Sequence, residues 1–121
     1  MQNKFYLYVR KSTDVEDKQV LSIEAQLVEL REYAKRENID ISAEYIEKQS
    51  AKAPGRPIFG KMIADIGKNG GNILAWHPDR LARNSIDGGQ IIYLLDGGKL
   101  GTLKFPSFWF ESTSQGKFML S

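Results

Sequence analysis

The stretch that decides the fold is Lys4-Phe5-Tyr6-Leu7-Tyr8-Val9-Arg10-Lys11-Ser12, close to the start of the chain. Residues 4–9 are mostly aromatic and aliphatic, with Phe, Leu and Val at alternate positions, which favours a β-strand. Charged residues and a hydroxyl follow at once, and residues 11–18 show no apolar period, so a loop is predicted there. We therefore expect polar functional groups at the carboxyl end of this strand.

Outward from this strand, helix and strand signals alternate as far as residue 105. Ser22 is suited to cap a helix, and apolar residues recur at helical spacing after it. Pro57 fits the first turn of a second helix. Ser85 is the expected cap of a third helix, in which Gly88 and Gly89 each cost about 1 kcal/mol relative to alanine. The predicted helices cover residues 22–37, 57–66 and 85–96, and the predicted strands cover 4–9, 41–46, 72–76 and 99–105.

This alternation predicts an α/β domain with a mostly parallel central sheet of about four strands flanked by helices. A length of 121 residues fits one domain, and a hydrophobic content of 41% is enough for a core. The chain has no cysteine, which excludes disulfides, zinc-thiolate sites and a thiol nucleophile. No apolar run reaches membrane-spanning length and no signal segment opens the chain, so we expect a cytoplasmic protein with no membrane partner.

The net charge of +2 is too small to predict nucleic-acid binding by itself, so the placement of the charges matters more. Arg10 follows the first strand, and Asp79-Arg80-Leu81-Ala82-Arg83 follows the third. A guanidinium grips phosphate oxygens in pairs, and the weakly nucleophilic Ser12 hydroxyl would need such neutralisation at its target. Arg80 and Arg83 would share one face of a helical turn. Taken alone, Asp-Arg-x-x-Arg is better explained as a solvated helix start.

The carboxyl ends of parallel strands lie on one edge of a sheet, where the functional residues of such folds gather. Arg10 and Ser12 follow the first predicted strand, and Ser50 and Arg56 follow the second. The third strand is followed by Asp79 and the two arginines. Three separate segments are therefore predicted to converge on one edge, which suits an alcohol that attacks a phosphoryl centre.

At these segments the chain resembles the catalytic domain of the serine recombinases, the resolvase and invertase family that includes large serine integrases. The segment from Tyr8 to Thr13 is similar to the family's Tyr-x-Arg-x-Ser motif. Gln19 and the segment Ser22-Ile23-Glu24-Ala25-Gln26, similar to Ser-Leu-x-x-Gln, come next. Two further segments match in order and spacing: Glu47-Lys48-Gln49-Ser50-Ala51 with Arg56-Pro57, and Pro78-Asp79-Arg80-Leu81-Ala82-Arg83.

This resemblance implies a phosphoryl transfer in which Ser12 attacks a DNA phosphodiester and becomes linked to the 5′ phosphate. Strand exchange and religation would follow without ATP, with no cofactor and no metal. The resemblance assigns charge stabilisation to Arg10, Arg80 and Arg83, with Arg56 assisting at the nucleophile or the phosphate. Asp79 would donate a proton to the leaving oxygen or orient an arginine, and these roles stay open. The implied supporting or DNA-binding residues are Tyr8, Gln19 and Ser50.

The resemblance also implies that residues 1–121 form the catalytic domain alone, and that the chain ends before the family's long dimerisation helix and DNA-binding domain. The implied partners are DNA, a second copy in a homodimer that assembles to a tetramer, and in addition a recombination directionality factor. The isolated fragment is then expected to be weakly active or inactive.

Two alternatives stay open at this point. The chain could be a catalytically silent interaction or regulatory module that keeps the same fold. It could also be an α/β domain that binds a nucleotide or phosphorylated metabolite at the same strand ends, although no phosphate-cradling glycine-rich motif follows the first strand.

Overall fold

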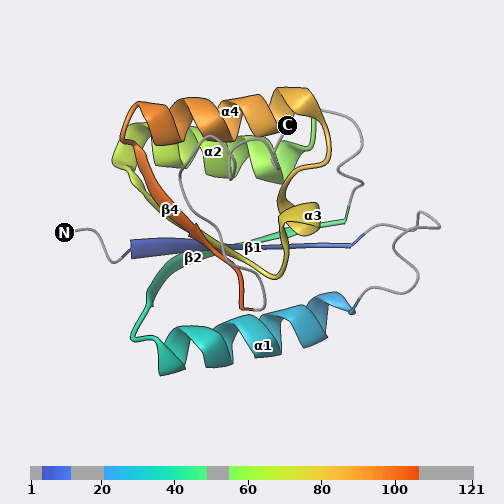
Figure 1. Cartoon of the computed structure of the whole chain (residues 1–121). Helices are drawn as coiled ribbons and strands as arrows, with labels where there is room; N and C mark the ends of the chain where they lie inside the picture. Colours follow the sequence, from blue (N-terminus) through green and yellow to red (C-terminus); the bar gives the residue numbers. More distant parts are fainter. Residues whose placement is uncertain (1–3, 12–20, 49–54, 107–121) are drawn as a thin grey trace.

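The computed structural model describes residues 4–11, 21–48 and 55–106 (Figure 1). Helices and strands alternate along them, and no helix in these ranges is long and apolar enough to cross a membrane. In chain order, the elements are β1 (Lys4–Arg10), α1 (Ile23–Arg36), β2 (Asp40–Glu47), α2 (Pro57–Asn69), β3 (Gly71–Ala75), α3 (Pro78–Leu81), α4 (Ser85–Asp96) and β4 (Leu100–Lys104).

The strands form one parallel sheet in the order β2-β1-β3-β4. β1 is central, and Tyr8 lies opposite Tyr45 of β2 on one side and Ala75 of β3 on the other. Every residue of β3 is buried, and β1 is buried from Phe5 to Arg10. Such burial is expected of parallel strands covered on both faces. The predicted α/β class and parallel four-stranded sheet are confirmed.

Helices cover both faces of the sheet, with α1 on one side and α2 and α4 on the other (Figure 1). Side chains along β1 point alternately to the two faces. Phe5, Leu7 and Val9 therefore pack with the apolar stripe of α1, whereas Tyr6 and Tyr8 pack with α2 and α4. The two cores thus share β1, so the position of this strand is determined from both sides.

The helix caps agree with the sequence prediction at α1 and differ at α4. Ser22 Oγ accepts a hydrogen bond from the Ala25 N–H at 3.1 Å, as expected of an N-cap. At α4 the prediction of Ser85 as the cap is wrong, because Ser85 is already helical. Asn84 has the extended backbone of the cap, and its Oδ1 accepts from the Asp87 N–H at 2.9 Å.

The arginine segment forms the short helix α3, which ends before the second arginine of the motif. The Ala82 N–H donates to the Pro78 carbonyl at 3.1 Å, and the helix stops at Leu81. Asn84 then takes the extended backbone that it needs to cap α4. The prediction that Arg80 and Arg83 share a helical face is therefore wrong, since Arg80 is buried and Arg83 is exposed.

Candidate functional site

The central feature of the candidate site is the carboxyl edge of β1 and β3. The chain leaves β1 toward β2 on one side and later returns to β3 on the other side. In open parallel sheets, this reversal point is where ligands bind. Here it brings Arg10, the last residue of β1, beside Arg80 of α3, which follows β3.

The two arginines are joined by a reciprocal pair of hydrogen bonds. Arg10 Nε donates to the carbonyl of Arg80 at 3.2 Å, and Arg80 Nη1 donates to the carbonyl of Arg10 at 3.2 Å. The Gln26 amide nitrogen also donates to the Arg10 carbonyl at 3.2 Å. Two positive side chains are thus held together by backbone acceptors at the edge of the sheet.

Arg56 lies at the start of α2 and connects the carboxyl edge of the sheet to the helices that cover it. Its Nη1 donates to the Tyr8 hydroxyl at 2.8 Å, and its Nη2 donates to the Leu81 carbonyl at 2.8 Å. Nη2 also forms an ion pair with Asp87 Oδ2 at 2.9 Å. The guanidinium carbon stands 4.1 Å from the centroid of the Phe59 ring, a cation–π distance. Arg56 therefore joins β1, α3 and α4 through one charged group.

Glu47, the last residue of β2, completes this buried cluster. Its Oε1 accepts from the Tyr8 hydroxyl at 2.9 Å and from the Phe59 N–H at 2.8 Å, and Oε2 accepts from the Ile58 N–H at 3.3 Å. The carboxylate thus caps α2, where the helix dipole favours negative charge. Burial raises the pKa of Tyr8 well above its usual value, and the Glu47 carboxylate adds to the shift while Arg56 opposes it.

The structure describes some of the predicted site residues and not others. Arg10, Arg56 and Arg80 converge as predicted, with exposed fractions of 0%, 3% and 2%. Tyr8 is also buried, and it contacts Arg56. Arg83 is the exposed member of the arginine set. Ser12, Gln19, Ser50 and the Asp79 side chain lie outside the described residues.

Three residues of the cluster had no role in the sequence prediction: Gln26, Glu47 and Asp87. Glu47 and Gln26 stand within the motifs that carry the resemblance, but an acidic strand end or a helical glutamine gives no signal of burial. Asp87 follows Asn84 by three residues, and this Asn-x-x-Asp spacing resembles a capping box. The spacing predicts the helix start, and only the fold shows that the Asp87 carboxylate also reaches Arg56.

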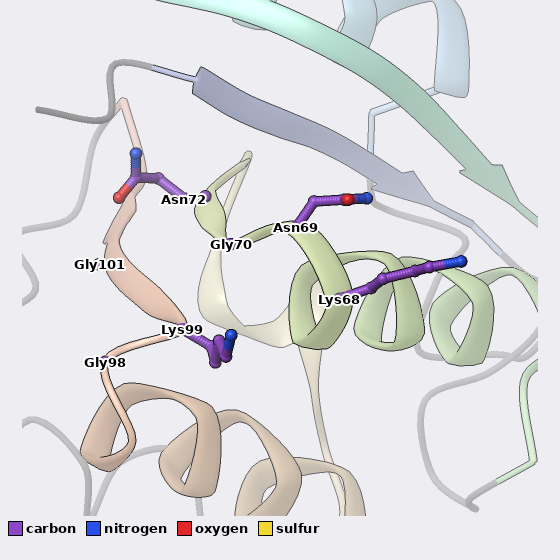
Figure 2. A pocket seen from close by; sticks show the side chains of 8 residues that line it. Lys68, Asn69, Gly70, Asn72, Gly98, Lys99 and Gly101 are labelled. Carbon is purple, nitrogen blue, oxygen red and sulfur yellow. The ribbon is translucent and has the colours of Figure 1, made fainter.

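The opposite edge of the sheet holds a cavity of about 470 Å³, which is distinct from this site (Figure 2). Its lining includes Lys68 and Lys99, together with residues at the carboxyl ends of α2 and α4. The dipoles of both helices place negative charge at these ends, which opposes the lysines for an anionic ligand. Within the described ranges, no group of three or more His, Asp or Glu side chains is placed to hold a metal ion.

Comparisons with known proteins agree with this architecture. The chain matches the family model for the resolvase N-terminal domain over residues 5–121. The N-terminal catalytic domain of TP901-1 integrase superposes with a TM-score of 0.73 at 24% identity, covering 97% of this chain and 88% of that one. A resolvase family site-specific recombinase from Streptococcus pneumoniae gives 0.72 at 26% identity, covering 97% and 82%. A serine recombinase from Sulfolobus solfataricus gives 0.65 at 18% identity, covering 88% and 71%. No curated protein sequence matches the chain.

The parallel sheet in 2-1-3-4 order, with its arginine-rich carboxyl edge, is the fold of a serine recombinase catalytic domain. The chain belongs to the resolvase N-terminal domain family, which its family model covers almost from end to end. The resemblance predicted from the sequence motifs is therefore confirmed.

Proposed function

We propose that the chain is the catalytic domain of a site-specific DNA recombinase in which Ser12 is the nucleophile. The observation that carries this proposal is the convergence of Arg10, Arg56 and Arg80 at the reversal point of the sheet. Ser12 follows Arg10 by two residues in the sequence, and the proposal assigns its hydroxyl to the same edge. Family membership supports DNA as the partner.

In the proposed reaction, Ser12 Oγ attacks a phosphodiester phosphorus and gives up its proton to solvent, while the bond from phosphorus to the 3′ oxygen breaks. The 3′ oxygen takes up a proton, for which Asp79 is the proposed donor or the residue that orients an arginine. One phosphodiester replaces another, so religation needs no ATP. Arg10, Arg80 and Arg83 stabilise the charge that develops on the phosphoryl oxygens.

Arg56 acts in this proposal by holding the site together. Its guanidinium donates hydrogen bonds to the Tyr8 hydroxyl, the Leu81 carbonyl and the Asp87 carboxylate. It assists the nucleophile and the phosphate by fixing α3, which carries Arg80. Gln19 and Ser50 are kept as proposed supporting contacts to DNA.

The proposal extends to the assembly in which the domain acts. Strand exchange requires two cleaved duplexes to be held together, so we include a homodimer that pairs into a tetramer. The proposed full protein adds a dimerisation helix and a DNA-binding domain, and a directionality factor selects the outcome. Residues 1–121 alone then give little recombination.

The test is a search for protein held covalently on DNA ends. The full-length protein is incubated with supercoiled DNA that carries the native flanking region of its gene, and the reaction is stopped in denaturant. We expect adducts with the wild type and with Ser42→Ala, an exposed strand serine that serves as the matched control. Ser12→Ala should form none. Adducts that persist in Ser12→Ala would place the nucleophile elsewhere.

A further inference from the structure

Gln26 is a buried side chain of α1 that reaches back to the end of β1. Its side chain is 0% exposed, although glutamine is usually a surface residue. The amide nitrogen donates to the Arg10 carbonyl at 3.2 Å and to the Leu21 carbonyl at 3.0 Å. Arg10 and Leu21 flank the stretch of sequence that carries Ser12.

Glutamine suits position 26 because its side-chain amide carries two N–H donors. Both partners are carbonyl oxygens, which only accept, so the nitrogen of the amide must face them. The NH2 group has two hydrogens, one for each carbonyl. Glutamate lacks these donors, and asparagine is one methylene shorter. Glutamine can therefore donate to the Arg10 and Leu21 carbonyls at once and fix the distance between them.

The other half of the Gln26 amide is its oxygen, Oε1. Gln26 Oε1 is buried and has no hydrogen-bond partner among the described residues. A buried carbonyl without a partner is unfavourable and rare in folded proteins. In this orientation the amide nitrogen donates to both carbonyls.

The Arg10 carbonyl links this contact to the arginines. It accepts from Gln26 Nε2 and from Arg80 Nη1, each at 3.2 Å. A carbonyl oxygen has two lone pairs, so both of its acceptor positions are used. Gln26 and Arg80 are therefore linked through one shared acceptor, the Arg10 carbonyl oxygen.

We propose that Gln26 is a positioning residue for the nucleophile: its amide clamps the carbonyls of Arg10 and Leu21, which flank Ser12 in the sequence, and it shares the Arg10 carbonyl with Arg80. The link to catalysis rests on the proposed function, because that function makes Ser12 the nucleophile. The clamp itself rests only on Arg10, Leu21 and Gln26.

The first measurement concerns the clamp and needs no DNA. Gln26→Glu keeps the shape but turns the two donors into a carboxylate oxygen, which repels both carbonyls. The Lys11 N–H donates to the Glu47 carbonyl at 3.2 Å just beyond β1, so its hydrogen exchange reports on this strand end. We expect its exchange to rise about 5- to 30-fold, the factor for losing one or two kcal/mol. The exchange of Leu7, in the middle of β1, should change far less.

Gln90→Glu makes the same substitution at an exposed position of α4 and is the matched control. It should leave the exchange of Lys11 unchanged. If Gln26→Glu does not fold, Gln26→Met takes its place, because methionine is of similar size and carries no charge. Unchanged Lys11 exchange in a folded Gln26 variant would overturn the proposal.

The second measurement uses the covalent-adduct assay on the full-length protein. We expect Gln26→Glu to slow adduct formation by about 100-fold, the loss that follows when reacting groups are misplaced, with DNA affinity unchanged. Burial raises the pKa of an introduced carboxyl, and its protonated form regains one donor. Activity should therefore recover partly as the pH is lowered from 7.5 to about 5.5, because the protonated fraction of the introduced carboxyl rises. Gln26→Met should show no such recovery.

The outcomes separate the clamp from the proposed function. A uniform loss in both Gln26 variants without pH recovery would mean a merely structural residue and would overturn the positioning role. If the wild type forms no Ser12-dependent adduct, the proposed function fails, and the exchange of Lys11 still decides whether the clamp exists.

Discussion

The side chains of Arg10 and Arg80 each donate a hydrogen bond to the backbone carbonyl of the other residue, both at 3.2 Å. The residues are 70 positions apart in sequence, and the pair joins the end of β1 to α3 across the reversal point of the sheet. Two like charges are brought together because each guanidinium is anchored on the partner's backbone. The pair therefore sets the distance between two segments of the proposed site.

Arg80→Lys should slow covalent adduct formation more than it weakens DNA binding. Lysine keeps the charge but replaces the planar fork of five N–H donors by one ammonium group. We expect the rate to fall by about 10²- to 10³-fold, the usual loss when one charge-stabilising donor is removed. The time course of adduct formation measures this. Arg36→Lys, an exposed change in the last turn of α1, should leave the rate of adduct formation unchanged. A wild-type rate for Arg80→Lys would contradict the role assigned to Arg80.

Asp87→Asn should destabilise the domain strongly. The substitution removes the anionic partner of Arg56, whose Nη2 lies 2.9 Å from Asp87 Oδ2 with both side chains nearly inaccessible. Breaking a buried pair by neutralising one partner costs about 3–5 kcal/mol. Urea denaturation followed by circular dichroism gives the change in free energy of unfolding. Asp40→Asn, at an exposed position of β2, is the control and should change it by less than about 0.5 kcal/mol.

Tyr8→Phe should lower stability at neutral pH, and its deficit should shrink in alkali. At pH 7 the change removes the bonds to Glu47 and from Arg56, at a cost of about 1–3 kcal/mol. The pKa of Tyr8 is raised by burial in the folded state. A raised folded pKa means stability that is complete below the unfolded value of about 10 and is lost as pH rises further.

The wild type should therefore lose up to about 1.4 kcal/mol per pH unit above pH 10 from this tyrosine, and Tyr8→Phe should not. Parallel urea titrations at pH 7.5 and pH 11 measure the difference. Tyr45 carries the same kind of shift, because burial and its 2.6 Å hydrogen bond to Asp65 raise its pKa. It is present in both proteins, so its contribution cancels. A constant deficit at both pH values would contradict the prediction.

Gly71→Ala and Gly89→Ala should change stability in opposite directions. Gly71 has a φ of +143°, and a Cβ there would lie 2.7 Å from Tyr6 Cε2 in the core. Gly89 lies in α4, and nothing stands within 4 Å of its Cβ position. We expect Gly89→Ala to raise the free energy of unfolding by about 0.5–1 kcal/mol, the helical difference between glycine and alanine. Gly71→Ala should lower it, as measured by thermal unfolding, and a stabilised Gly71→Ala would refute the close contact.

Arg83→Gln should weaken DNA binding and reduce its salt dependence. Arg83 is the exposed member of the arginine set, and the proposed function makes it a phosphate contact. Loss of one phosphate contact should lower the slope of log K against log salt by about 1. Binding measured between low and moderate salt gives this slope. Arg36→Gln, on the far helix α1, should leave the slope unchanged, and an unaltered slope in Arg83→Gln would remove Arg83 from the interface.

Much of the site could be anticipated from the sequence, because parallel strands send their carboxyl ends to one edge. The positions of Arg10, Arg56 and Arg80 follow from this rule once the strands are recognised. Their contacts do not follow from it. A pattern of residues predicts which segments meet, but it carries no information on which donor faces which acceptor.

By itself, the sequence determined the parallel α/β sheet, the cap at Ser22 and the convergence of Arg10, Arg56 and Arg80, since periodicity and motif spacing are local properties. Only the tertiary structure decided that α3 stops at Leu81, that Asp87 pairs with Arg56 and that the Gln26 amide joins two carbonyls. These features depend on which polar groups become buried together. Burial is a property of the packed chain, and a buried polar group must find its partner wherever the fold places one.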